Sequence, residues 1–112
     1  MRFVSIASGS SGNCIYAGTE TTHVLIDAGI STKRIEKGLC DVGVKPSELS
    51  AICITHEHSD HVRGLGVLSR KYEIPIYGTE KTLEEIRKMK YLGEYPRELF
   101  RPIRPDVDFA VG

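Results

Sequence analysis

Three of the four histidines in this chain fall within six positions, and a carboxylate stands among them in the segment THEHSDH. Alternate side chains of an extended segment point the same way, so His56 and His58 can reach one ion. A turn near Ser59 would direct Asp60 and His61 toward a second ion close by. Zinc accepts imidazole and carboxylate ligands, as do manganese and iron. A polar loop capping a strand is the alternative, but three imidazoles give such a loop no packing benefit.

The histidine segment is similar to the H-x-H-x-D-H signature of the metallo-β-lactamase superfamily of hydrolases. Three more segments, SGSSGN, LIDAG and VRGLGVL, resemble its YycJ/WalJ-type branch, bacterial cytoplasmic proteins regarded as nuclease-like phosphodiesterases. This resemblance covers nearly the whole chain. The signature alone leaves the substrate open, because thioesterases, lactamases and nucleases share it, and only the additional segments favour the branch.

The resemblance implies a four-layer αββα sandwich built from two similar halves, which usually takes about twice the length of this chain. With 112 residues, the chain resembles the N-terminal half. We therefore expect an α/β fold, with helices packed on a mixed β-sheet, and one partial domain over residues 1–112. Such a half leaves an apolar sheet face uncovered, and that face would seek a partner.

The same resemblance assigns the metal ligands. His56 and His58 would hold the first ion and Asp60 and His61 the second, with zinc preferred in both places and Asp60 also the candidate catalytic residue. Three further ligands, two histidines and a bridging aspartate, belong to the second half, and no histidine follows His61 here. With four of seven ligands, the chain is expected to be inactive alone. A second copy or a separate second-half chain would have to complete the site.

Two other segments are candidates for the site. Asp27 ends an apolar strand, and the resemblance implies that it hydrogen-bonds the ligand loop and steadies an imidazole without touching metal. A turn former ahead of Gly29 is the alternative. The Ser/Gly-rich segment near the start could offer backbone N–H groups to a phosphate, although a plain hairpin turn explains it equally well. The candidate substrate contacts in it are Ser8, Ser10, Ser11 and Asn13.

Charge does not select a partner for the chain. Fifteen basic and fifteen acidic residues cancel, so no overall field draws it to nucleic acid or to a membrane surface. Local basic groups could still bind a phosphodiester, and solvated helix faces are the alternative interpretation. These groups are Lys33, Arg34 and Lys37; Arg87, Lys88 and Lys90; and Arg97, Arg101 and Arg104.

The three cysteines are widely spaced and contain no C-x-x-C pair. Each sits in an apolar stretch, so all three are interpreted as small buried hydrophobes rather than disulfides or zinc ligands. No stretch approaches membrane-spanning length, and a reducing cytoplasm fits.

Hydrophobic periodicity predicts a strand meander followed by alternating helices and strands. The predicted strands are Arg2–Ala7, Cys14–Ala17, His23–Ile26, Ser50–Thr55 and Ile74–Tyr77, with two weak strands closing the chain. The predicted helices are Thr32–Asp41 with Ser31 as its N-cap, His61–Tyr72, and Lys81–Met89 behind a cap at Thr79.

The leading functional hypothesis is a metal-dependent hydrolase of phosphodiesters, with nucleic acid as substrate. Thioester or lactam hydrolysis with the same metals is a second enzymatic interpretation. A non-catalytic metal-binding or interaction module that docks to a partner is the third.

Overall fold

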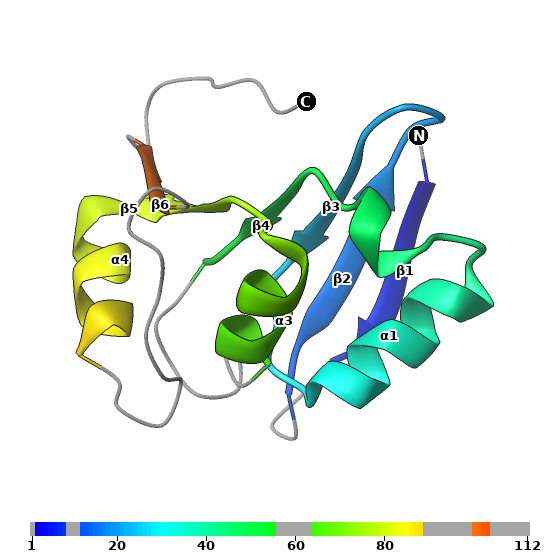
Figure 1. Ribbon diagram of the computed structural model, residues 1–112, viewed down its shortest axis with the longest axis horizontal. Helices are drawn as coiled ribbons and strands as arrows, with labels where there is room; N and C mark the ends of the chain where they lie inside the picture. The colour runs from blue at the N-terminus through cyan, green and yellow to red at the C-terminus, as the bar shows by residue number, and fades with distance from the viewer. Residues whose placement is uncertain (1, 9–11, 56–63, 89–99, 104–112) are drawn as a thin grey trace.

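A computed structural model describes residues 2–8, 12–55, 64–88 and 100–103 (Figure 1). Six strands form one sheet in the order of the sequence. The strands are β1 (Arg2–Ala7), β2 (Cys14–Gly18), β3 (His23–Ile26), β4 (Ala51–Cys53), β5 (Ile76–Thr79) and β6 (Phe100–Ile103). The helices are α1 (Thr32–Asp41), the 3₁₀ turn η1 (Pro46–Glu48), α3 (Leu65–Tyr72) and α4 (Glu80–Arg87).

The sheet is mixed, as the α/β prediction requires. Strands β1, β2 and β3 pair antiparallel and form the predicted meander. From β3 onward every neighbouring pair is parallel. A parallel neighbour needs a crossover connection, and α1 lies between β3 and β4, α3 between β4 and β5, and α4 between β5 and β6. The carboxyl ends of four strands therefore meet at one edge of the sheet.

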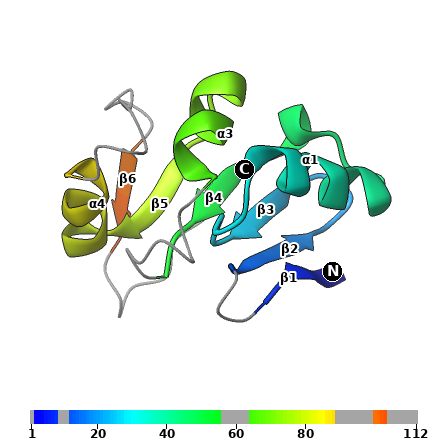
Figure 2. The same ribbon diagram turned by 90° about the horizontal axis from the view of Figure 1, so that it is seen from below.

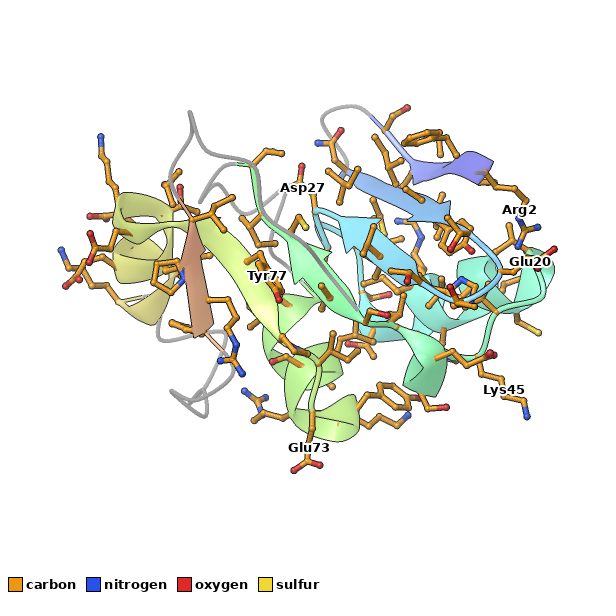
Figure 3. The ribbon with its side chains drawn as sticks, turned by 90° about the horizontal axis from the view of Figure 1, so that it is seen from above. Arg2, Glu20, Asp27, Lys45, Glu73 and Tyr77 are labelled. Atoms are coloured by element: carbon orange, nitrogen blue, oxygen red, sulfur yellow. The ribbon has the colours of Figure 1, made fainter. Side chains whose placement is uncertain are left out.

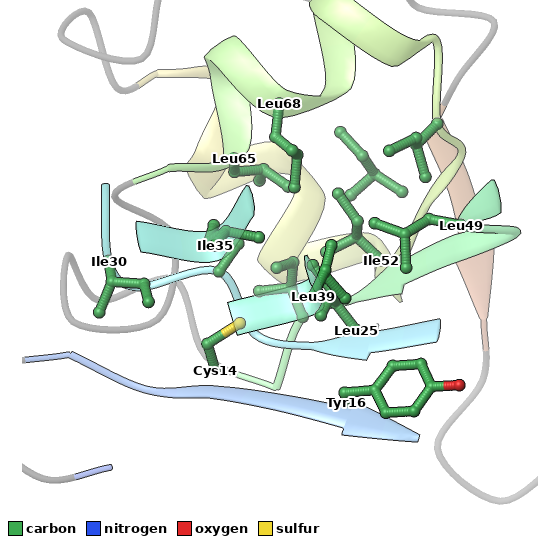
Figure 4. Packing of buried hydrophobic residues seen from close by; sticks show 14 of the residues in the cluster. Cys14, Tyr16, Leu25, Ile30, Ile35, Leu39, Leu49, Ile52, Leu65 and Leu68 are labelled. Atoms are coloured by element: carbon green, nitrogen blue, oxygen red, sulfur yellow. The ribbon is translucent and has the colours of Figure 1, made fainter. Parts of the chain in front are cut away.

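One face of the sheet carries the core. A row of paired residues crosses five strands, from Tyr16 through Leu25, Ile52 and Ile76 to Phe100, and every member is buried. Helices α1, α3 and α4 cover this face with apolar side chains such as Ile35, Leu68 and Ile86 (Figures 2 and 4). The two-residue period of the strands thus places a continuous apolar row under the helices.

The opposite face is more open. The neighbouring row, which runs through Ile15, Ile26, Cys53 and Tyr77, is only half-buried. Phe3 on the edge strand β1 is 67% exposed. This is the distribution expected of a sheet that has helices on one side only.

The element boundaries agree with the sequence expectations apart from short shifts. Helix α1 has the predicted bounds, and Ser31 Oγ accepts from Arg34 N at 3.4 Å as its N-cap. Strand β5 begins two residues later than predicted, because the chain first passes through a left-handed residue at Glu73 and then through Pro75, which has no N–H to pair. Of the weak closing strands, the structure describes β6.

The cysteine prediction is partly wrong. Cys14 is buried and Cys53 half-buried, but Cys40 is exposed. In α1 the inward positions are Ile35 and Leu39, and the residue after Leu39 is rotated by about 100° toward solvent. All three thiols are free. Within the described ranges, no helix is long and apolar enough to cross a membrane.

Candidate metal centre

The predicted ligands His56, His58, Asp60 and His61 belong to residues 56–63, which lie outside the described residues. The structure defines what holds the two ends of this segment. This segment follows β4, whose carboxyl end lies beside the carboxyl end of the parallel strand β3. The described residues that border the segment are Thr55 and Gly64.

The upstream end is fixed by Asp27. One oxygen of its carboxylate accepts from the Thr55 backbone N–H at 2.8 Å, and the other accepts from Thr55 Oγ1 at 2.7 Å. Asp27 N donates in turn to Cys53 O at 2.8 Å. Asp27 is 5% exposed and has a left-handed backbone with φ of 65°, a conformation that aspartate tolerates better than most residues. Its bonds hold the residue directly before His56.

The residue after the segment contacts the loop that follows β3 and begins with Asp27. Gly64 N donates to Ala28 O at 2.7 Å, and Gly64 is the N-cap of α3. A Cβ at Gly64 would run into Ile30 O and would lie 2.8 Å from Ile35 Cδ1. This glycine therefore allows α3 to begin against the loop between β3 and α1. We call that loop, Asp27–Ser31, the anchor loop.

A third segment also meets the anchor loop. Gly29 N donates to Asn13 O at 2.8 Å. Gly12 has a φ of 134°, and a Cβ on it would lie 2.6 Å from Gly29 O and 2.7 Å from Ile30 Cγ2. The Ser/Gly segment is therefore joined to the scaffold that holds residues 56–63. Of its candidate substrate contacts, Ser8 is exposed and Asn13 half-buried, while Ser10 and Ser11 lie outside the described residues.

The cysteines near this edge are poor metal ligands. Burial raises the pKa of the Cys14 thiol to about 12, and the negative charge of Asp27 adds to the effect. The same two causes, in the same order, raise the pKa of Cys53. Metals bind the thiolate, so both side chains stay protonated and unsuited to ligation near neutral pH. Within the described ranges, no three His, Cys, Asp or Glu side chains group together as a metal site.

A cavity lies at the other end of the sheet. It has a volume of about 470 Å³ and includes Arg2, Glu20 and His23 in its lining. His23 Nδ1 is 2.6 Å from the Tyr16 hydroxyl, and the Arg2 guanidinium lies 5.5 Å from the Tyr16 ring centroid. Figure 3 shows Arg2 and Glu20 far from Asp27. His23 is thus a packed residue at the start of β3.

Sequence reasoning singled out Asp27 but missed its partner. Thr55 was expected only as the last residue of a strand, and Gly12 only as part of a turn. A threonine directly before the first histidine was the available signal, since its hydroxyl and N–H can bind one carboxylate together. The predicted contact of Asp27 with an imidazole stays a prediction, because the histidines lie outside the described part of the chain.

Comparison with known proteins decides the family. Residues 7–111 match the Metallo-beta-lactamase superfamily. The chain belongs to this superfamily. It is 48% identical to Exodeoxyribonuclease WalJ of Streptococcus pneumoniae serotype 2 (strain D39 / NCTC 7466), over 83% of this chain and 35% of that protein. It is 42% identical to Exodeoxyribonuclease YycJ of Bacillus anthracis, over 88% of this chain and 36% of that protein. The chain thus spans about a third of the length of these relatives.

Solved structures agree on the fold. A B3 metallo-β-lactamase described as the first with an active-site glutamic acid superposes with a TM-score of 0.78 at 20% identity, covering 98% of this chain and 46% of that one. The Rm3 metallo-β-lactamase gives a TM-score of 0.77 at 23% identity and covers 98% and 45% of the two chains. Both the resemblance read from the motifs and the predicted fold class are confirmed.

The residues present fit a divalent metal ion. Superfamily members bind divalent metals, and three imidazoles with one carboxylate in six positions are a suitable donor set. Both carboxylate oxygens of Asp27 accept from Thr55, the residue that precedes the first predicted ligand. The residues on both sides of the ligand segment, Thr55 and Gly64, are bonded to the same loop.

Proposed function

We propose that this chain supplies the metal-binding N-terminal part of a metal-dependent phosphodiesterase that cleaves DNA. His56 and His58 would hold one divalent ion, and Asp60 and His61 a second, with zinc as the preferred metal. Bound ions of this kind act as Lewis acids on a phosphoryl oxygen and lower the pKa of water to give a nucleophile near neutral pH. The attachment of both ends of this segment to the anchor loop is the observation that carries the proposal.

The role of the described residues in this reaction is positioning. Asp27 fixes the direction in which the chain leaves β4 through its two bonds to Thr55. Gly64 fixes the point at which α3 begins through its bond to Ala28. The Ser/Gly segment, tied to Gly29 through Asn13 O, would contact the substrate at the same edge.

Phosphodiesters are the favoured substrate class. Both relatives described above, which are 48% and 42% identical over most of this chain, are named exodeoxyribonucleases. The solved β-lactamases share 20% and 23% identity, which supports the fold but not their substrate. We also place the protein in the cytoplasm, where the free thiols of the three cysteines would persist.

The proposal includes an incomplete site. Residues 1–112 would act as one partial domain that contributes four ligands, with three more supplied by a second polypeptide portion or a second copy. The open sheet face, with Phe3 67% exposed, is where such a partner would pack. A measurement of solution mass with and without zinc tests this point, because a zinc-dependent increase in mass is expected only if copies complete one another.

Metal binding is tested on the chain itself. Isothermal titration of zinc into the purified chain should show binding that the double variant H56A/H58A loses. H23A is the matched control, because His23 lies at the far end of the sheet. Equal zinc binding by the wild type and H56A/H58A would reject the assignment of the ligands.

Catalysis is tested in a completed site. We would fuse this chain to the part of Streptococcus pneumoniae WalJ that lies beyond the matched region. The fusion should degrade DNA in a metal-dependent manner, and H56A/H58A should abolish that activity. Hydrolysis of an acyl-thioester or a lactam by the fusion, without cleavage of DNA, would select the alternative chemistry, and metal binding without any hydrolysis would select the binding module.

A further inference from the structure

A groove lies between helix α1 and the edge strand β1, next to the anchor loop. Its volume is about 190 Å³. Its lining residues are Ile6, Ile30, Arg34, Lys37, Gly38 and Asp41. It contains two members of the first basic group noted in the sequence, and neither the proposed metal site nor its anchors use them.

The floor of the groove is apolar and closely packed. A Cβ at Gly38 would lie 2.5 Å from Ile6 Cγ2, so the absence of a side chain at Gly38 lets α1 approach β1. A glycine inside a helix costs about 1 kcal/mol relative to alanine, and here the close approach explains its presence. The result is a shallow apolar channel with charged side chains along one wall.

The groove begins at the anchor loop. Ile30 belongs to both, and its Cγ2 faces the position of a Cβ on Gly12 in the Ser/Gly segment. Arg34 lies in the first turn of α1, where its N–H bonds to Ser31 Oγ. Lys37 follows one turn later, and Asp41 lies at the far end of the helix. Charge along the groove therefore changes from positive near the proposed site to negative away from it.

The two cations are available for a ligand. Arg34 and Lys37 are both exposed, and within the described ranges their side chains form no hydrogen bond or ion pair. Glu36 of the same helix is instead neutralised by Lys71 of α3, with Nζ and Oε2 2.8 Å apart. The Glu36 carboxylate, which lies between the two cations in the sequence, is thus paired with a residue of α3.

We propose that this groove binds the sugar–phosphate backbone of a single DNA strand next to the nucleotide being cleaved. The inference rests on the proposed function and deepens it. The Arg34 guanidinium would hold phosphate oxygens through its fork of N–H donors, and Lys37 would act as a point charge on the next phosphate. The half-buried Ile6 would contact the sugar or an unstacked base. Asp41 would repel a further phosphate and so limit the length of the path.

The test measures binding of a fluorescently labelled single-stranded oligodeoxynucleotide to the chain by anisotropy, in EDTA, over a series of salt concentrations. R34A/K37A should weaken binding at least about tenfold and reduce the log–log salt slope by roughly 1.4, since each single-strand phosphate contact contributes about 0.7. D41N should strengthen binding about twofold through the loss of repulsion. Circular dichroism melting checks that each variant is folded.

K33A is the matched control, because Lys33 is an exposed cation of the same helix that does not line the groove. Binding within about twofold of the wild type is expected for it. Equal losses in K33A and R34A/K37A, or no effect of R34A/K37A, would overturn the inference. So would displacement of the oligonucleotide by inorganic phosphate at matched ionic strength, which would show a site for isolated phosphate only.

The test of the groove and the test of the proposed nuclease function can fail independently. If the fusion protein degrades DNA while R34A/K37A binds as tightly as the wild type, the groove is rejected and the nuclease stands. If the fusion has no nuclease activity but R34A/K37A still loses oligonucleotide binding selectively, the groove stands as a DNA-binding site and the nuclease is rejected.

Discussion

At the carboxyl ends of β3 and β4, a single loop, the anchor loop, holds several segments that are far apart in the sequence, whereas the opposite end of the sheet is held by separate contacts, some local and some long-range. Asp27 and Thr55 are 28 positions apart, and Tyr16 and His23 are only seven apart in one hairpin. The first end depends on backbone bonds and on glycines without room for a Cβ. The second combines side-chain contacts around Tyr16 with bonds from the Arg2 guanidinium to Val42 O and from Ser50 N to His23 O. Substitutions at the two ends should therefore have different consequences for the metal site.

The largest effect is expected from Asp27→Ala. It leaves the Thr55 N–H and hydroxyl without their carboxylate, which costs about 1–3 kcal/mol of stability. It also frees the start of the ligand segment, so zinc affinity should fall about 10- to 100-fold. Calorimetric zinc titration and thermal unfolding measure the two effects.

Asp27→Asn is the control for charge and backbone. Asparagine also tolerates the left-handed φ and keeps one acceptor oxygen for the Thr55 N–H. Its losses in stability and affinity should be smaller than those of the alanine variant. Unchanged zinc affinity in Asp27→Ala would contradict the expectation that substitutions at the two ends of the sheet affect the metal site differently.

Gly64→Ala should follow in size. The new Cβ would press on Ile30 O and Ile35 Cδ1, with an overpacking cost of about 1–3 kcal/mol and a smaller loss of zinc affinity than in Asp27→Ala. Gly43→Ala is the matched glycine control. Gly43 has a φ of 80° with no atom within 4 Å of a Cβ, so only stability should fall, by about 1 kcal/mol. Equal zinc affinities in the two variants would contradict the role of Gly64.

Tyr16→Phe probes the opposite end. It removes the hydroxyl that contacts His23 Nδ1 and should cost about 1 kcal/mol, measured by denaturant unfolding. Zinc affinity should equal that of the wild type. A parallel loss of zinc affinity would show that the far end also shapes the metal site.

The smallest effect concerns the contact between α1 and α3. Hydrogen bonds from Lys71 and then Tyr72 lower the pKa of Glu36 below its usual value of 4.5. A depressed folded-state pKa stabilises the fold above the unfolded value and loses that contribution as the pH falls. Glu36→Gln should therefore melt below the wild type near neutral pH, with the difference shrinking at pH values under about 4.5. A difference that grows on acidification would contradict this sign.

The sequence predicted the scaffold well because strong local signals agree with the tertiary packing. Ser31 and Thr79 are N-caps as expected, and each accepts from a backbone N–H of its own helix. The bond between Asp27 and Thr55 could not be read from periodicity, because it depends on which parallel strands become neighbours. The same holds for the close packing of Gly64 against the anchor loop and α1. Long-range contacts of this kind follow from topology rather than from local pattern.

Attachment of the ligand segment at both ends to Asp27 and Ala28 has an evolutionary consequence. Residues 56–63 can be exchanged as a unit, since the described bonds at the two borders are made by Asp27, Thr55, Ala28 and Gly64, all of which lie outside this segment. Changes of residue type inside it can alter chemistry while the surrounding architecture persists. Insertion of even one residue, by contrast, would have to be accommodated between Thr55 and Gly64, whose positions are fixed by their bonds to the anchor loop.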